Sequence, residues 1–280
     1  MMSYFNNDKE KLRKFLLPLK KGYVHASNLL KKLTDKKWKK QSSFLFECAE
    51  KYKKFHENFD VKNLTCSVNA WNKYLNFVRI NNKRNGNEIF NFQSKFESTI
   101  LEECVFRLFA HYSSDTIRIG GIEAYSNLYF SLNSFKDFED KSPIQINTKT
   151  QDFAIYKRVE IIVDNKSTAV NVPVIAIECK TYLDKTMLEG SIETAEKIKS
   201  GNAHCKFYIV AEKYNVDRNV AIKHSRIDQI FVLKKDTGKK DTGIIHVDVV
   251  ESLIKDINSH LEQQWTDIEE NIKNKGIVIS

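Results

Sequence analysis

Two charged side chains close the most apolar segment of the chain. Residues 172–177 read VPVIAI and are followed at once by Glu178, Cys179 and Lys180. Because side chains alternate between the two faces of a strand, Glu178 and Lys180 are expected on the same face. A second carboxylate, Asp152, stands 26 residues upstream, where a segment of alternating apolar residues begins. If these two strands pair, Asp152 approaches Glu178.

Two carboxylates in an otherwise apolar sheet would repel each other unless a cation lies between them. Oxygen ligands suit Mg²⁺, and the main-chain carbonyl of Cys179 is a candidate third oxygen. Lys180 would then orient or polarise a water molecule that attacks phosphorus. A metal ion, a positioned water and neutralisation of developing charge are what metal-assisted phosphodiester hydrolysis requires. The pattern therefore predicts this chemistry for Asp152, Glu178 and Lys180.

The same residues carry a resemblance to a known family. Asp152 with Glu178-Cys179-Lys180 resembles the signature of the PD-(D/E)XK nuclease superfamily, with Gln151 where that signature often has proline. The segments QDFAIYKRVEIIVD and VPVIAIECKTYLDKTMLEGSIETAEKIKSGN are similar to a group of type II restriction endonucleases that includes an enzyme of two related, non-identical subunits. The resemblance covers roughly residues 92–215.

The resemblance implies a fold and an activity. The fold would be α/β, a restriction-endonuclease-like core in which helices flank a mixed central sheet. Asp152 and Glu178 would be metal ligands and Lys180 the catalytic lysine. The activity would be Mg²⁺-dependent cleavage of double-stranded DNA at specific sites, leaving 5′-phosphate ends. One such chain has one site, so a double-strand break would need a second subunit, identical or related.

A third carboxylate is expected from the helix before the motif. The stretch SKFESTILEECV contains Glu97, Glu102 and Glu103. Glu102 stands beside an apolar face and is the preferred third metal ligand, although an ordinary surface glutamate fits the pattern equally well. Glu160 is the replacement if Asp152 proves distant from Glu178.

Hydrophobic periodicity predicts helices in the first third of the chain and an α/β layer after it. The polar segment NNKRNGN divides residues 1–88, a basic helical region for DNA binding or subunit contact, from residues 89–280, the nuclease core. The core is expected to contain three helices, over residues 92–109, 183–199 and 249–261. Its expected strands begin near Thr148 and include residues 172–177, 207–210, 230–233 and 244–249.

Positive charge is concentrated at the N-terminal end. The chain has 45 Lys and Arg against 36 Asp and Glu, a net charge of +9. Residues 1–90 hold 20 basic and 8 acidic residues, or +12, which leaves 25 against 28, or −3, for the rest. Such a surface favours a polyanion, with nucleic acid as the leading candidate. The candidate phosphate contacts are Lys36, Lys37, Lys39 and Lys40, for which a solvated helix face is the competing interpretation.

Other classes are disfavoured. Five cysteines without a C-x-x-C pair argue against a disulfide framework or a zinc knuckle, and a reduced, cytoplasmic location is expected. No apolar run is long enough for a membrane helix, so no membrane contact is expected. No H-x-H or H-x₃-H pair and no phosphate-binding glycine loop occurs. Two alternatives stay open: a repair or junction-resolving nuclease on the same core, and a non-catalytic DNA-binding module.

Overall fold

The computed structural model describes residues 8–84, 87–90, 94–132, 134–140, 144–163, 166–217, 222–235, 243–263, 265 and 268–276. Its α-helices are α1 Lys9–Leu19, α2 Val24–Thr34, α3 Ser42–Asn58, α4 Leu64–Asn81, α5 Ser98–Phe109, α6 Phe135–Asp140, α7 Lys185–Gly201, α8 Val247–Glu262 and α9 Ile268–Lys275. Its strands are β1 Lys83–Arg84, β2 Asn87–Glu88, β3 Arg118–Phe130, β4 Ile144–Val163, β5 Lys166–Lys180, β6 Lys206–Ala211 and β7 Gln229–Val232.

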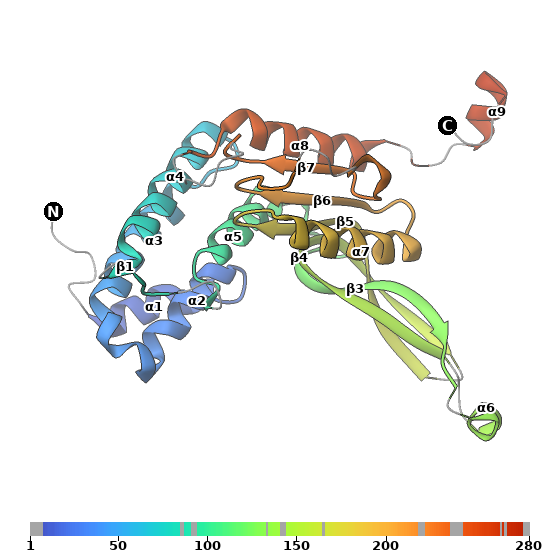
Figure 1. Ribbon diagram of the computed structural model, residues 1–280, viewed down its shortest axis with the longest axis horizontal. Helices are drawn as coiled ribbons and strands as arrows, with labels where there is room; N and C mark the ends of the chain where they lie inside the picture. Colours follow the sequence, from blue (N-terminus) through green and yellow to red (C-terminus); the bar gives the residue numbers. More distant parts are fainter. Residues whose placement is uncertain are drawn as a thin grey trace.

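The helical N-terminal part and the sheet meet at α5. Figure 1 shows α1 to α4 grouped at one end of the molecule, with α5 between them and the strands. β3 and β4 continue beyond the sheet as a long arm that carries α6 at its tip (Figure 1). Helix α8 runs along the β7 edge and contacts α4, so the C-terminal part of the fold closes onto the N-terminal helices.

A mixed five-stranded sheet, in the order β3-β4-β5-β6-β7, forms the centre of the fold. β4 pairs antiparallel with both β3 and β5, whereas β5, β6 and β7 run parallel. In the β4–β5 ladder Phe153 is opposite Ile177, so Asp152 stands opposite Glu178 in the continuing register. The carboxyl end of β5 pairs with β6 up to Lys180. The motif therefore lies where these strands end.

The two faces of the sheet bury different side chains. Phe153 and Ile177 belong to a large apolar cluster that includes α5, α8 and the N-terminal helices. Ala154 and Ala176, one residue away on each strand, belong to a smaller cluster with α7. The small side chains let α7 approach the sheet closely. The larger cluster contains residues from both sides of the expected boundary at residue 88, and the division into two regions stays a prediction.

The buried carboxylate of Glu103 fixes α5 to the N-terminal helices. Glu103 is fully buried and accepts hydrogen bonds from the main-chain N–H groups of His25 and Ala26, at 2.9 and 3.1 Å, in the first turn of α2. It also accepts from the Tyr52 hydroxyl at 2.7 Å and pairs with Arg107 at 2.8 Å. A negative charge at a helix N-terminus is favourable, so the orientation of α5 is held by this contact.

Several sequence-based expectations need correction. The helix expected over 92–109 is α-helical only from Ser98, and residues 91–93 lie outside the described part of the chain. Strand β3 was not anticipated, and Gly120 and Gly121 lie within it. Residues 244–249 are not a strand, because α8 begins at Val247 and the main chain of Ile245 is hydrogen-bonded at both N–H and C=O by the side chain of Asn72 on α4.

Among the residues that the structure describes, none of the helices combines the length and apolar character needed to cross a lipid bilayer.

Candidate active site

The carboxylate of Asp152 is bound to the main chain of the motif strand. The N–H of Cys179 donates a 2.8 Å hydrogen bond to Asp152 Oδ2. This contact brings the upstream acid to the position that the spacing predicted, beside Glu178 and Lys180. Glu160 lies further along β4, opposite Ala169, and is exposed, so the replacement role does not arise.

Two side chains hold the carboxylate of Glu178. The residue is 9% exposed, and its Oε2 atom lies 2.5 Å from the hydroxyl of Ser191 on α7. The ammonium of Lys180 is 3.0 Å from the same oxygen. Sequence reasoning missed Ser191, which stands thirteen residues beyond Glu178 on the helix that follows the motif. Helix α7 therefore orients the carboxylate as well as covering the sheet.

Lys180 remains a cation. Burial favours its neutral form, but Glu178 and then Asp152 outweigh burial and raise the pKa of Lys180 above its ordinary value. The group therefore stays an ammonium at neutral pH. It can donate hydrogen bonds to an anionic oxygen or to a water, and it can stabilise negative charge that develops nearby.

The carbonyl of Lys180 is also fixed. It accepts a 2.9 Å hydrogen bond from the N–H of Glu212, the residue after β6. The Glu212 side chain is fully buried, and its Oε2 lies 2.6 Å from Arg79 Nη2 and 3.3 Å from Lys234 Nζ. Since Arg79 belongs to α4, this charge cluster ties the N-terminal helices to the end of the motif strand.

The three glutamates near the start of α5 have different roles. Glu97 pairs with Arg79 and Asn82, and Glu103 is the buried anchor of α2. Glu102 interacts electrostatically with Asp152 and Lys180. Burial, and then repulsion by Asp152, raises the pKa of Glu102 to about 7. The structure thus places Glu102 beside the predicted site, and its service as a third ligand stays a prediction.

Asp152 also resists ionisation. Burial raises the pKa of Asp152 above its usual range, although the hydrogen bond from Cys179 and the charge of Lys180 oppose the rise. Two neighbouring acids with raised pKa values form a site where a cation would be favourable. Within the described part of the chain, no three His, Cys, Asp or Glu side chains are close enough to form a metal-binding group by themselves.

Gly121 lets β3 pass close behind Asp152. A Cβ atom at position 121 would lie 3.1 Å from the carbonyl oxygen of Asp152 and 3.4 Å from that of Gln151. The β3–β4 ladder is irregular at this point, between Gly120 and Ile122. Gly120 has a φ of 130°, a conformation that other residues rarely adopt. The paired glycines therefore shape the strand that supports Asp152.

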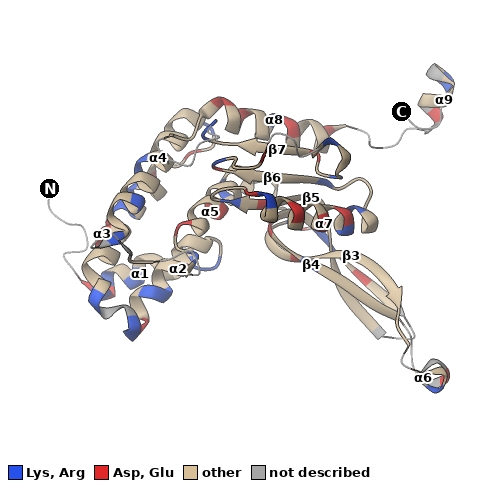
Figure 2. Ribbon diagram, in the orientation of Figure 1, with Lys and Arg blue, Asp and Glu red and all other residues tan. Residues whose placement is uncertain are grey.

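The predicted basic cluster lies away from the core strands. Residues Lys36–Gln41 form a 3-10 helix, η1, in which Lys36, Lys37 and Lys40 are exposed, and the side chain of Lys39 lies outside the described residues. Lys32 instead is buried, with its ammonium 4.5 Å from the centre of the Phe90 ring. Figure 2 shows lysines and arginines recurring over the N-terminal helices.

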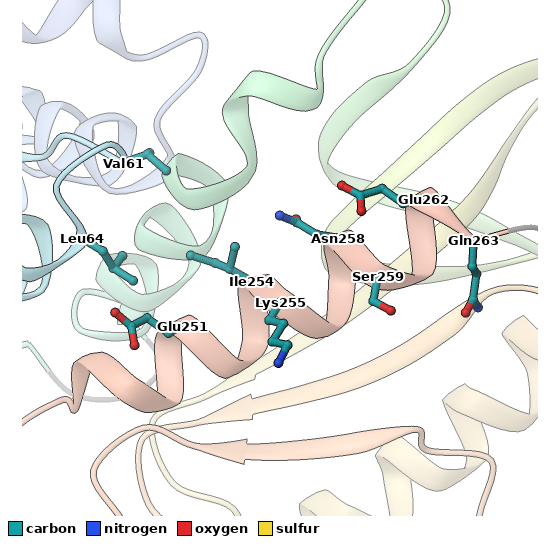
Figure 3. A pocket seen from close by; sticks show the side chains of 9 residues that line it. All are labelled: Val61, Leu64, Glu251, Ile254, Lys255, Asn258, Ser259, Glu262 and Gln263. Carbon is teal, nitrogen blue, oxygen red and sulfur yellow. The ribbon is translucent and has the colours of Figure 1, made fainter.

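Two hollows in the described structure lie outside the motif. Figure 3 shows one at the junction of α8 with the start of α4, lined by Val61, Leu64, Glu251, Ile254, Lys255, Asn258, Ser259, Glu262 and Gln263. The other is an open groove between α3 and α4, and its lining includes Lys51, Lys54 and Lys73. Neither contains the motif carboxylates, and only the second has an excess of positive charge.

The fold matches that of a solved structure. A solved structure described as a native BbvCI A2B2 tetramer at low resolution superposes with a TM-score of 0.69 over 86% of this chain and 96% of that chain. The two sequences are 20% identical, so this likeness establishes the fold. The expected α/β core with a helical N-terminal part is thereby confirmed.

The family follows from the sequence match. The model of the Bpu10I restriction endonuclease family matches residues 93–240, which is more than half of the chain and includes every residue of the motif. The chain belongs to this family, and the resemblance to type II restriction endonucleases is confirmed. None of the curated proteins compared with the chain matches it.

Proposed function

We propose that this protein is a type II restriction endonuclease that cleaves double-stranded DNA at specific sites with Mg²⁺. The observation that carries the proposal is the bond from Cys179 N–H to Asp152 Oδ2, because it places two carboxylates and one lysine at the end of β5. The family match supports the nuclease class. The products would carry 5′-phosphate ends.

The donor set of the site suits Mg²⁺. This ion prefers oxygen ligands and is usually held by one or two carboxylates, with waters and substrate phosphates completing its shell. Asp152 and Glu178 provide two carboxylates, and the Cys179 carbonyl and Glu102 are further candidate donors. When bound, the metal would supply Lewis-acid chemistry and lower the pKa of a bound water.

The residues around the metal would each have a separate role. Asp152 and Glu178 hold the cation, and Ser191 orients Glu178 through its hydroxyl. Lys180 donates hydrogen bonds from its ammonium to the attacked phosphate and balances its charge. The lysines of the N-terminal part, Lys36, Lys37, Lys39 and Lys40 among them, would neutralise backbone phosphates of the DNA.

A second subunit is part of the proposal. One chain has one such site and cuts one strand, so a double-strand break needs two chains related by the symmetry of the duplex. The structural neighbour is described as an A2B2 tetramer, which supports a multisubunit assembly here, either of identical or of related chains.

The direct test is incubation of the purified protein with unmethylated plasmid DNA, with and without Mg²⁺. Discrete fragments that need Mg²⁺ are expected, and sequencing their ends gives the recognition site and the end chemistry. Nicked circles alone would indicate that a different second subunit is required. A smear, or cutting only at branched DNA, would replace the restriction activity by another nuclease activity. Intact DNA with both Mg²⁺ and Mn²⁺ would overturn the proposal.

A further inference from the structure

Arg79, in the last turn of α4, pairs with two carboxylates from different parts of the fold. Its Nη2 atom is 2.6 Å from Oε2 of Glu212, the residue after β6. Its Nε atom is 3.3 Å from Oε2 of Glu97, the residue before α5. The Arg79 side chain is 16% exposed, and that of Glu212 is fully buried. One planar guanidinium thus joins three elements in the fixed geometry that arginine gives to its carboxylate partners.

The contact with Glu212 reaches the end of the motif strand through the main chain. The N–H of Glu212 donates a 2.9 Å hydrogen bond to the carbonyl of Lys180. The Glu212 carbonyl accepts from the N–H of Lys234 at 3.1 Å, and the Lys234 ammonium is 3.3 Å from Glu212 Oε2. Glu212 is therefore held by both its main chain and its side chain, so a shift of its carboxylate would be transmitted to the Lys180 carbonyl.

The contact with Glu97 reaches the start of α5. Glu97 Oε1 also accepts a 2.8 Å hydrogen bond from the side-chain amide of Asn82, the residue that ends α4. Glu102 follows on α5, and this helix contacts β5. Because a helix is a rigid support, holding its first turn also holds the position of Glu102. The guanidinium therefore contacts the start of one element of the candidate site and, through a single residue, the end of another.

Net stability is a weak explanation for this charge cluster. Two cations and two carboxylates, Arg79 and Lys234 with Glu97 and Glu212, are gathered near the carboxyl ends of β6 and β7. Removing charges from water is costly, and replacing a buried ion pair by apolar side chains is often neutral or stabilising. Charge-assisted pairs that involve arginine do supply a defined orientation. The position of the cluster, at the end of the motif strand, gives that orientation a use.

We propose that Arg79 is a positioning residue for DNA cleavage, because its guanidinium sets the end of β5, which carries Lys180, relative to α5, which carries Glu102. The inference rests on the proposed nuclease function and adds to it a residue from the N-terminal part of the chain. Arg79 precedes residue 93, where the family match begins, so the match assigns it no role. It acts through Glu212 and Glu97 and is not a catalytic residue.

The test compares Arg79→Met and Arg79→Lys with the matched control Lys199→Met. Arg79→Met removes both contacts, whereas Arg79→Lys keeps the charge but offers one nitrogen where two make contacts. The side chain of Lys199 is 15% exposed and pairs with Asp228 Oδ2 at 2.6 Å, and that carboxylate accepts from the N–H of Phe207 at 2.7 Å. The control therefore removes one cation from an equally buried ion pair near the opposite end of β6.

Two measurements separate positioning from stability. Single-turnover cleavage is measured at saturating protein, well below the melting temperature of each variant, with DNA binding in EDTA alongside. Hydrogen–deuterium exchange reports the protection of the Glu212 amide, which is bonded to the Lys180 carbonyl.

Arg79→Met should cleave on the order of a hundredfold more slowly, since a distant mutation that displaces a reacting group by about 1 Å can have this effect. Arg79→Lys should be slower than the wild type by about tenfold or more for the same reason. In both variants the Glu212 amide should exchange faster. DNA affinity and its salt dependence should stay as in the wild type, because a guanidinium paired inside the protein neutralises no phosphate.

Lys199→Met should match the wild type in cleavage and in protection of the Glu212 amide. Equal cleavage rates for folded Arg79→Met and Lys199→Met would overturn the proposal, as would a loss of cleavage that disappears on cooling, which marks an effect on stability alone. Slow cleavage with unchanged exchange at Glu212 would overturn it as well. If Arg79→Met does not fold, Arg79→Lys decides the same comparisons. If the wild type cuts no DNA, the proposed function fails, and the exchange measurement still decides whether Arg79 fixes the end of β5.

Discussion

The N–H of Cys179 and the carboxylate of Asp152 are joined by a 2.8 Å hydrogen bond between neighbouring strands. The bond uses the main chain of the central motif residue, so it is independent of the Cys179 side chain, which faces the apolar cluster around α5. Asp152 is thereby fixed beside the strand end that carries Glu178 and Lys180. A separation of 27 residues in the chain becomes a contact across one strand pair.

Lys180→Ala should abolish cleavage and spare DNA binding. The ammonium contacts Glu178 at 3.0 Å and its pKa is raised, so it acts as a fixed positive charge. Removing one such charge-stabilising group typically costs about 10²–10³ in rate. Single-turnover cleavage and a binding assay on the same preparation separate the two effects. Full nicking activity in this variant would refute the assignment.

Ser191→Ala should impair Mg²⁺-dependent cleavage more than it lowers the stability of the fold. Its hydroxyl lies 2.5 Å from Glu178 Oε2, and loss of a group that orients a ligand typically costs about 10–100-fold in metal affinity or activity. The measurement is the Mg²⁺ concentration for half-maximal cleavage. Thr194→Ala is the matched control, since this hydroxyl donates to the Gly190 carbonyl on the same helix. Equal Mg²⁺ curves for the two variants would contradict the role of Ser191.

Gly121→Ala should slow cleavage by about tenfold or more. The new Cβ would press on the Asp152 carbonyl at 3.1 Å, and displacing a reacting group by about 1 Å can cost on the order of a hundredfold. Gly190→Ala on α7 meets nothing within 4 Å and should stabilise the protein by about 1 kcal/mol through helix propensity. Thermal melts and cleavage rates are compared for both. Unaltered cleavage by Gly121→Ala would show that the strand yields without moving Asp152.

Glu102 should make stability depend on pH in metal-free protein. Its pKa is about 7 in the folded state against 4.5 ordinarily, so the folded state holds the extra proton between these values. This contribution is fully present below about pH 4.5 and is lost as the pH rises through about 7. Glu102→Gln lacks the titration and should gain stability relative to the wild type between about pH 5 and pH 8. Denaturant titrations in EDTA measure this, and a constant difference would argue against the raised pKa.

The N-terminal lysines should determine the salt dependence of DNA binding. Changing Lys36, Lys37, Lys39 and Lys40 to Gln should make the slope of log K against log salt shallower by about 0.9 for each phosphate contact that is lost. The comparison variant changes Lys51, Lys54 and Lys73, which line the groove between α3 and α4. If only the groove variant alters the slope, the DNA-facing surface is the groove and the η1 lysines are a solvated face.

Local pattern predicted the elements that are buried on both sides. Residues 172–177 lie in β5, and residues 207–210 lie in β6. A continuous apolar sequence is typical of a central parallel strand, because such a strand is buried on both faces. Residues 244–249 have the same β-branched composition and yet precede and enter α8. There the main chain of Ile245 is hydrogen-bonded to the side chain of Asn72 on α4, 173 residues away. The sequence around Ile245 does not indicate that contact.

The glycine that ends α7 shows a similar limit. A glycine just beyond the helix expected over 183–199 is typical of a helix end in a left-handed conformation, but Gly201 is the last helical residue. A Cβ there would lie 2.0 Å from the carbonyl oxygen of Ser126 on β3. The glycine is therefore required by close packing between two elements, which the helix sequence alone cannot reveal.

The sequence by itself determined the residue types of the site, the strand that ends in them and the family to which the chain belongs, because these depend on short segments and their spacing. Tertiary structure decided which of three glutamates in the stretch SKFESTILEECV lies near Asp152, and it supplied Ser191 and Gly121. Each of these reaches the site from a different element, and the packing of helices on both faces of the sheet sets those distances.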